Sequence, residues 1–192
     1  MSLYHHFDKK ILYIDMDGVV ADFEKSIRLH LPEWDRMSQE EKAGQTDAVC
    51  GNVPGFFENL DPIHGAIDAV KRLSEVYETY FLSAAMWNVP QSYSEKRLWV
   101  EKHFGDGFRK RLILTHRKDL AIGHFLVDDR TSHGAGKFIG KHLQFGSEEF
   151  PDWNSVEKYL NGFDLYIPKD WKPDTKIYES HPSKFLNDDN LI

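Results

Sequence analysis

Polar side chains with catalytic potential follow the apolar runs that we expect to form strands. Asp15 and Asp17 come at the end of the first run, and Ser83 ends the second. Lys118 lies shortly after the third run, and Asp128–Asp129 end the fourth. In open parallel sheets, ligands bind at the edge formed by the carboxyl ends of the strands. We therefore expect these carboxylates to meet an ammonium group and a hydroxyl at one edge.

These residue types favour a phosphoryl-transfer site that holds a metal ion. Neighbouring carboxylates repel one another unless one takes up a proton or they share a cation. Hard oxygen ligands around an open position suit Mg2+, and a lysine there can offset the charge of an incoming phosphate. Positioning and charge neutralisation are most of what a phosphoryl transfer needs. Taken singly, each residue has a plainer interpretation as a turn residue, a helix cap or a surface lysine. The inference rests on their order and on their shared position at strand ends.

Length and composition limit what this chain can be. The 192 residues correspond to one domain, with 41% apolar and 29% charged residues, which is ordinary for a globular protein. The formal net charge of −7 disfavours general binding to nucleic-acid polymers or anionic membranes, which usually requires a basic surface. Cys50 is the single cysteine, so no internal disulfide can form, and we expect a reducing, cytoplasmic location. No apolar run reaches about 18 residues, so we expect no membrane span.

Short apolar runs alternate with amphipathic segments along the chain. An unbroken apolar run is typical of a strand buried on both faces, and apolar residues three and four apart indicate a helix. Their alternation predicts an α/β fold with a Rossmann-like parallel sheet and helices on both faces. Ser92 and Glu95 have the spacing of a capping box, which predicts that a helix begins there. The expected strands are 10–15, 79–82, 112–114, 125–127 and 142–145, and the expected helices are 22–31, 64–77, 92–103 and 152–160.

Residues 19–62 interrupt this alternation. They are too long for an ordinary connection between two elements, so we interpret them as a small α-helical cap inserted into the sheet domain. The α/β core then consists of residues 1–18 and 63–162. Residues 163–192 contain several prolines without clear periodicity, and we expect an extended C-terminal tail.

The ordered motifs resemble those of a known superfamily. Asp15-Met16-Asp17-Gly18-Val19, Ser83, Lys118 and Asp128-Asp129 are similar to the four motifs of haloacid dehalogenase-like (HAD) phosphohydrolases. Within that superfamily, the chain resembles the 5'(3')-deoxyribonucleotidases (5' nucleotidase, deoxy pyrimidine, cytosolic type C) over about residues 10–146. The stretches that carry the resemblance are DMDGVVADFE (15–24), FFENLDPIHG (56–65), SEKRLWVEKHFG (94–105), LTHRK (114–118) and FLVDDR (125–130).

The resemblance implies a role for each carboxylate. Asp15 would be the nucleophile that forms an aspartyl-phosphate, which splits hydrolysis into two displacements. Asp17 would be the general acid/base, which protonates the leaving oxygen and then takes a proton from the attacking water. Mg2+ would be held by Asp15, by the backbone carbonyl of Asp17 and by Asp128.

The resemblance also implies which groups bind the phosphate. Ser83, the backbone of Ala84 and Lys118 would contact phosphoryl oxygens, and Lys118 would act in catalysis by holding Asp15 and the phosphate together. Lys96 matches a second phosphate-contacting lysine of the deoxyribonucleotidases; its plainer interpretation is a solvated helix residue. Ser83 stands where these enzymes more often have Thr. Ala84 stands where they often have Ser, so we expect one hydrogen bond fewer to the phosphate.

Aromatic residues are the candidates for the pocket that receives the leaving group. Phe23 matches a residue that contacts the base in the deoxyribonucleotidases. Phe56, Phe57 and Trp87 are further candidates for stacking on a flat ring, as is Trp34. Phe56 and Phe57 have an equally good second interpretation, in which they seal the cap against the core.

The resulting hypothesis is a Mg2+-dependent phosphatase that hydrolyses 5'-(deoxy)ribonucleoside monophosphates. A first alternative keeps this chemistry on a sugar phosphate or another small phosphomonoester. A second is a non-catalytic binding or regulatory protein on the same fold, which the intact carboxylates and Lys118 disfavour. The expected partner is a small phosphomonoester rather than a nucleic-acid polymer or a membrane. The oligomeric state stays open, with a homodimer as one option.

Overall fold

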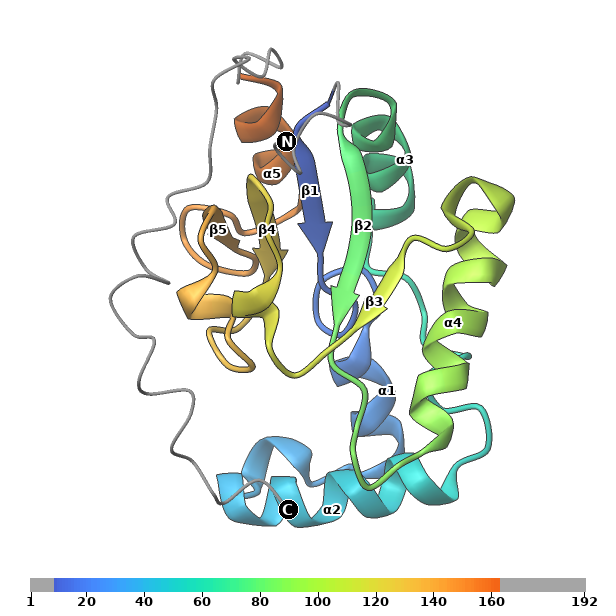
Figure 1. The fold of residues 1–192 in the computed structure, drawn as a ribbon. Helices are drawn as coiled ribbons and strands as arrows, with labels where there is room; N and C mark the ends of the chain where they lie inside the picture. Colours follow the sequence, from blue (N-terminus) through green and yellow to red (C-terminus); the bar gives the residue numbers. More distant parts are fainter. Residues whose placement is uncertain (1–8, 163–192) are drawn as a thin grey trace, which may run out of the picture.

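The computed structural model describes residues 9–162, so the expected tail at 163–192 and the first eight residues of the expected core lie outside the described residues. The described chain contains a parallel sheet of five strands in the order β3-β2-β1-β4-β5 (Figure 1). The strands are β1 (Ile11–Ile14), β2 (Glu78–Ser83), β3 (Leu112–Leu114), β4 (Phe125–Asp128) and β5 (Lys141–Gln144). Each lies at or within a few residues of its predicted position, so the predicted parallel α/β sheet is confirmed.

The register of the central strands explains why the candidate residues meet. β1 and β4 are buried along their whole length, as expected of apolar strands covered on both faces. Ile14 pairs with Phe81 of β2 and with Val127 of β4. Asp15 and Asp128 directly follow Ile14 and Val127, so the register brings these two carboxylates level at one edge of the sheet.

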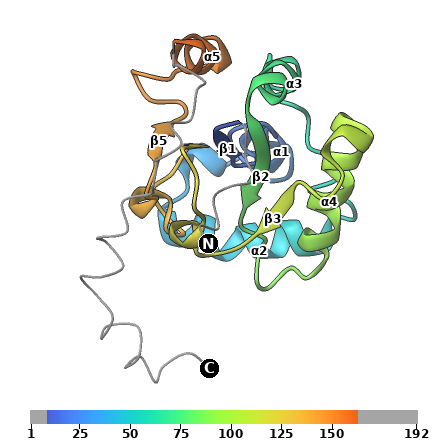
Figure 2. The same ribbon diagram turned by 45° about the horizontal axis from the view of Figure 1, so that its top comes forward.

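The α-helices of the core gather on one face of the sheet. The helices that follow the cap segment are α3 (Ala66–Val76), α4 (Gln91–Phe104), η2 (Gly105–Phe108), η3 (Lys118–Leu120), η4 (Ala135–Lys137) and α5 (Trp153–Asn161), where η marks a 3-10 helix. Leu12 and Ile14 share one core cluster with residues of α3, α4 and α5, and Figure 2 shows α3 and α5 on the same side of the sheet. Ile11 and Tyr13 alternate with them and face a second cluster that includes Ala135 of η4. Helices thus lie on both faces, as predicted, but the helix that packs in the second cluster is the short 3-10 helix η4.

The start of α4 differs from the prediction. Its N-cap is Pro90, and no side chain caps it. The hydroxyl of Ser92 instead accepts a hydrogen bond from the N–H of Met86 at 3.0 Å, and Glu95 accepts from N–H groups in the segment 55–57. The predicted capping box is therefore wrong, because both side chains have partners outside the helix.

The segment between β1 and α3 forms a small helical layer. Its helices are α1 (Phe23–His30), η1 (Trp34–Arg36) and α2 (Gln39–Asn52). The N–H of Asp22 donates to the backbone carbonyl of Asp61 at 2.8 Å, and the N–H of Ile63 donates to the carbonyl of Val20 at 2.9 Å. The chain therefore enters and leaves the layer at neighbouring positions. In Figure 1, α2 crosses the end of the sheet to which the strand arrows point. The layer therefore lies over the edge that carries the candidate residues.

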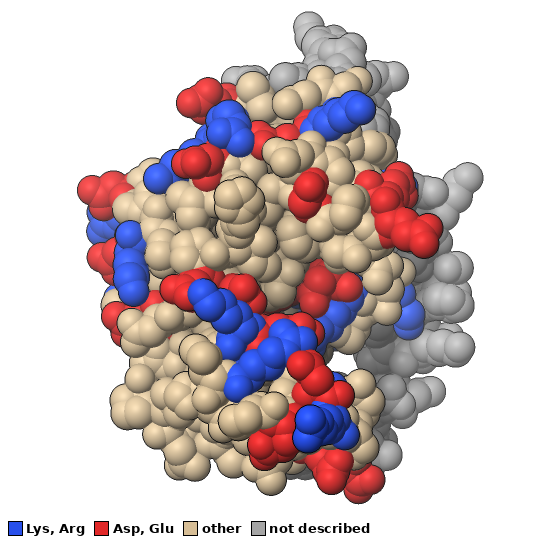
Figure 3. Space-filling model, turned by 180° about the vertical axis from the view of Figure 1, so that it is seen from behind, with Lys and Arg blue, Asp and Glu red and all other residues tan. Residues whose placement is uncertain are grey.

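The surface carries charges of both signs in close mixture. Figure 3 shows Lys and Arg side chains interspersed with Asp and Glu over the back of the molecule. Ion pairs account for part of this mixture, among them Lys25–Asp61 and Arg72–Glu157, both at 2.7 Å. Within residues 9–162, no helix combines the length and apolar character needed to cross a membrane.

Candidate active site

The loop after β1 carries the first two candidate carboxylates. The N–H groups of Val20 and Ala21 both donate to the carbonyl of Met16 at 2.9 Å, which closes the chain into a tight turn. Gly18 has a φ of 76°, a conformation that glycine adopts without strain. A Cβ at this position would lie 2.7 Å from Asp129 Oδ2. The close approach of Asp129 to the loop therefore also requires a glycine.

The start of η3 places Lys118 in the buried edge. Its backbone N–H donates to the carbonyl of His133 at 2.8 Å. Its ammonium group lies 3.0 Å from Asp15 Oδ1 and donates to Asp128 Oδ2. Burial opposes the charge on Lys118, but the two carboxylates outweigh burial and raise its pKa. Lys118 therefore joins Asp15 to Asp128 as a charged group.

Lys96 reaches the same edge from α4 and is completely buried. Its ammonium group donates to Asp17 Oδ2 at 2.7 Å and to Ser83 Oγ at 3.2 Å, and it lies 5.1 Å from the ring centre of Phe57. A buried ammonium group needs such partners, because removing a charge from water is costly. The interpretation of Lys96 as a solvated helix residue is wrong. Lys96 lies outside the lining of the cavity described below and contacts Asp17 and Ser83, which belong to that lining.

A group of carboxylates gives this edge an excess of negative charge. Asp15, Asp128 and Asp129 bring oxygen atoms within 4.8 Å of one another. Burial and the charge of Asp15 raise the pKa of Asp128, and burial raises the pKa of Asp129 to about 6. With Asp17, four carboxylates face only two buried lysines. Oxygen ligands with unbalanced negative charge fit a divalent cation such as Mg2+.

Hydrogen bonds show which carboxylate of the Asp128–Asp129 pair has a free oxygen. Asp128 accepts from Lys118 through Oδ2 and from the N–H of Arg130 through Oδ1. Asp129 accepts from the Arg130 side chain through Oδ2 at 3.2 Å. Its Oδ1 is buried and has no hydrogen-bond partner among the described residues. The sequence-based assignment named Asp128 as metal ligand and did not include Asp129, although the second Asp of FLVDDR was the available signal.

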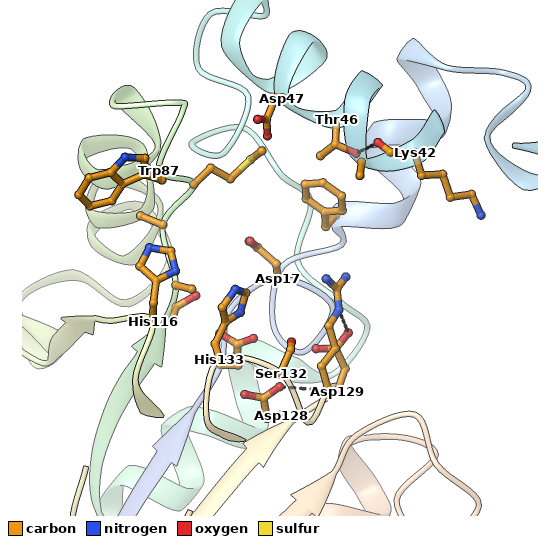
Figure 4. A pocket seen from close by; sticks show the side chains of 18 of the residues that line it. Asp17, Lys42, Thr46, Asp47, Trp87, His116, Asp128, Asp129, Ser132 and His133 are labelled. Atoms are coloured by element: carbon orange, nitrogen blue, oxygen red, sulfur yellow. Dashed lines mark hydrogen bonds and ion pairs between the residues drawn. The ribbon is translucent and has the colours of Figure 1, made fainter. Parts of the chain in front are cut away.

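A cavity of about 820 Å3 opens above these carboxylates, between the core and the cap segment. Figure 4 shows Trp87 and His116 on one side of it, Thr46 and Asp47 on α2, and Asp17 between them. The core supplies Asp15, Asp17, Ser83, Ala84, Lys118, Asp128, Asp129, His116, Ser132 and His133, and the cap segment supplies Phe23, Trp34, Gln39, Lys42, Thr46 and Asp47. The polar residues of α2 and the two histidines were not predicted, since no spacing in the sequence places them here.

The structure separates the five aromatic candidates into two groups. Phe23, Trp34 and Trp87 line the cavity. Phe56 and Phe57 are only 2% and 1% exposed and lie outside the lining. Their ring centres lie 5.6 Å and 6.2 Å from that of Phe23. The pair thus packs beneath Phe23, as in the interpretation that they seal the cap against the core, and their assignment to the pocket wall is a misplacement.

Comparisons with known proteins identify the family of this chain. The family model described as "5' nucleotidase, deoxy (Pyrimidine), cytosolic type C protein" matches residues 9–161. A protein of Vibrio phage KVP40 named "Putative 5'(3')-deoxyribonucleotidase" is 48% identical over 80% of this chain and 85% of its own length. The human 5'(3')-deoxyribonucleotidase of cytosolic type is 32% identical over 74% of this chain and 76% of its own length.

A solved structure supports the fold. The "putative HAD-hydrolase YfnB" from Bacillus subtilis, described as bound to magnesium, aligns with a TM-score of 0.53 at 11% identity. The alignment covers 81% of this chain and all of that one. At this identity the likeness shows the HAD-like fold alone. The chain therefore belongs to the 5' nucleotidase, deoxy (pyrimidine), cytosolic type C family of phosphoric monoester hydrolases.

Proposed function

We propose that this protein is a Mg2+-dependent phosphatase that hydrolyses 5'-(deoxy)ribonucleoside monophosphates through an aspartyl-phosphate on Asp15. The observation that carries the proposal is the contact of Lys118 with both Asp15 and Asp128 at the floor of a cavity. A carboxylate beside a buried cation and a cavity is placed to attack a bound phosphoryl group. The named relatives are deoxyribonucleotidases, which favours a nucleotide as substrate.

In the proposed reaction, two aspartates divide the work. A carboxylate oxygen of Asp15 attacks phosphorus, and the bond from phosphorus to the leaving oxygen breaks. Asp17 gives its proton to that oxygen, so the nucleoside leaves as an alcohol. Asp17 then takes a proton from water as the water attacks phosphorus, and the bond to Asp15 breaks to release phosphate. Lys96 holds Oδ2 of Asp17, while Oδ1 is buried without a partner among the described residues and is the atom free to carry the proton.

In this proposal, the metal would be held by Asp15, by the backbone carbonyl of Asp17 and by Asp128–Asp129. Within the pair, Asp129 Oδ1 is the atom without a hydrogen-bond partner among residues 9–162. When bound, Mg2+ would polarise the phosphoryl group and offset the charge that the carboxylates and the phosphate bring together. Lys118, Ser83 and the backbone at Ala84 would bind the remaining phosphoryl oxygens.

The proposal also covers the cap, the location and the assembly. Residues 19–62 act as a cap that receives the nucleoside, with Phe23 and Trp87, which both line the cavity, as ring-stacking residues. A cytosolic-type relative supports the proposed cytoplasmic location.

We also propose that the protein forms a homodimer. Light scattering tests this assembly, and a monomeric mass would exclude it.

The experiment measures phosphate release from a panel of substrates with Mg2+ or with EDTA. The panel contains dUMP, dTMP, UMP, dAMP, their 3' isomers, sugar phosphates and p-nitrophenyl phosphate. We expect Mg2+-dependent release that is fastest on 5'-nucleotides and absent in Asp15→Asn and Asp17→Asn. Release mainly from sugar phosphates would keep the mechanism and overturn the substrate. Absence of release from every compound by the folded protein would favour a binding protein instead.

Phe23 provides a test of the base pocket within the same assay. We expect Phe23→Ala to raise KM for nucleotides by about tenfold, the order expected when stacking on one ring is lost. KM for p-nitrophenyl phosphate should change less, because its smaller leaving group reaches less of the cap. An equal change for both substrates would remove Phe23 from the base pocket.

A further inference from the structure

The core side of the cavity carries a group of three polar side chains that the proposed reaction leaves without a role. His116, Ser132 and His133 all line the cavity, and Figure 4 shows them on the side opposite α2. The ring centres of the two histidines lie 5.3 Å apart with planes at 69°. The Nε2 atom of His116 is buried and has no hydrogen-bond partner among residues 9–162. We call these three residues the histidine wall.

Backbone hydrogen bonds fix Ser132 and His133 of the histidine wall beside Lys118. His133 has a φ of 51° and is followed by Gly134 at 84°. A left-handed conformation at a non-glycine residue is uncommon and persists where the surroundings fix it. The carbonyl of His133 accepts from the N–H of Lys118 at 2.8 Å, and the carbonyl of Ser132 accepts from Ala135 at 3.0 Å. The turn that carries Ser132 and His133 is thus bonded to the lysine that holds Asp15.

This position decides which part of a nucleotide the wall meets. In a 5'-nucleotide, only an oxygen and a methylene group separate phosphorus from the sugar ring. With the phosphoryl group at Asp15, the sugar lies a few bonds from the cavity floor, within reach of lining residues close to Lys118 such as His133. Neutral imidazole and hydroxyl groups each donate and accept hydrogen bonds, which matches a sugar hydroxyl.

We propose that His116, Ser132 and His133 bind the hydroxyl groups of the nucleotide sugar and are specificity-determining residues of this enzyme. The inference rests on the proposed function, since it requires a nucleotide in the cavity. It goes beyond that function because it assigns sugar recognition to the core rather than to the cap. It also predicts that discrimination between sugars depends on the wall and not on Phe23.

The test combines deletions in the enzyme with deletions in the substrate. We would measure kcat/KM for UMP, dUMP and 2',3'-dideoxyuridine 5'-monophosphate, which differ only in their sugar hydroxyls. The enzyme variants are His116→Phe, which keeps the ring shape without its nitrogens, and His133→Gly, which removes the ring and suits a positive φ. Lys110→Gly is the matched control, because Lys110 also has a positive φ, of 64°, and lies outside the cavity.

In wild type and in Lys110→Gly alike, we expect kcat/KM to differ by about tenfold between two substrates that differ by one sugar hydroxyl. This is the size of effect expected from one hydrogen bond. In His116→Phe or His133→Gly, that ratio should fall to near one. A ratio unchanged in both folded variants would overturn the inference, as would a wild-type enzyme that treats all three substrates alike. If one variant does not fold, the other decides. Failure of the proposed function has a different signature, because wild type would then hydrolyse none of the three nucleotides.

Discussion

Four carboxylates at one sheet edge face two buried ammonium groups, and hydrogen bonds decide which carboxylate has an oxygen to spare. Lys118 and the backbone of Arg130 occupy both oxygens of Asp128. Asp129 has a buried oxygen without a partner among the described residues. Gly18 permits Asp129 to approach the loop after β1. Within this pair, Asp129 thus has an oxygen, Oδ1, that no hydrogen bond from the described residues occupies. Asp128 instead orients Lys118 through a hydrogen bond.

The first prediction tests Asp129 as a metal ligand. Asp129→Asn should raise the Mg2+ concentration for half-maximal phosphate release by about tenfold or more, because removing a carboxylate weakens binding of a hard cation. The measurement is a Mg2+ titration of activity, with calorimetry of Mg2+ binding as a second readout. Asp61→Asn is the control, since Asp61 forms an exposed ion pair with Lys25. An unchanged Mg2+ requirement in Asp129→Asn would contradict this assignment.

At the scale of elements, α4 connects the segment after α2 to Asp17, the proposed general acid. Glu95 is buried and accepts from the N–H groups of Gly55 at 3.1 Å and Phe57 at 3.0 Å. The next residue, Lys96, binds Asp17. One turn of α4 therefore fixes the return of the chain from the cap and the position of Asp17 together.

The second prediction concerns this anchor. In Glu95→Gln, one side-chain oxygen becomes an NH2 group, so one backbone N–H loses its acceptor. Leaving such a buried donor unpaired should lower the free energy of unfolding by about 1–3 kcal/mol, measured by urea denaturation. Glu101→Gln on the same helix breaks only an exposed ion pair with Arg97 and should change stability by less than about 1 kcal/mol. Equal effects of the two substitutions would refute the anchor.

The third prediction concerns the start of β1. The N–H of Ile11 donates to Nδ1 of His124 at 2.9 Å, and burial lowers the pKa of His124 to about 4. Its ordinary pKa is about 6.5, so the unfolded chain takes up the proton first as the pH falls. This contribution to stability is complete above about pH 6.5 and is lost progressively between about pH 6.5 and 4.

His124→Asn isolates the effect of that histidine, because an amide oxygen can accept the same hydrogen bond without titrating. Urea denaturation at about pH 7 and about pH 5 should show a larger loss of stability in wild type than in the variant. Parallel losses in the two proteins would show that His124 does not titrate in this way.

At the scale of the whole molecule, the sequence predicted the sheet and its catalytic edge because both depend on local signals. Apolar runs that end in Asp15, Ser83 and Asp128 identify strands and their carboxyl ends at once. The cap side could not be predicted in the same way. Glu95 caps no helix, and Phe56 lies beneath Phe23, because their partners come from distant segments. Spacing along the chain carries no information about such contacts.

The cavity shows the same division between core and cap. Its floor comes from the strand ends and was predicted nearly completely. Its roof comes from α2, whose polar side chains include Thr46 and Asp47. The histidine wall lies on turns after β3 and β4, where only the folded chain brings His116 beside His133. The residues to which we assign substrate choice therefore lie in the parts of the molecule that sequence patterns describe least.

The most direct test of the central claim is to look for the phosphoryl group on Asp15 during turnover. Wild type would be mixed with dUMP and Mg2+ and quenched in acid within the first turnover. Mass spectrometry of the peptides would then locate any added phosphoryl group. We expect a phosphoryl group on the peptide that contains Asp15, and neither label nor turnover in Asp15→Asn. Turnover of dUMP by Asp15→Asn at a rate close to wild type, or a label on another residue, would contradict it.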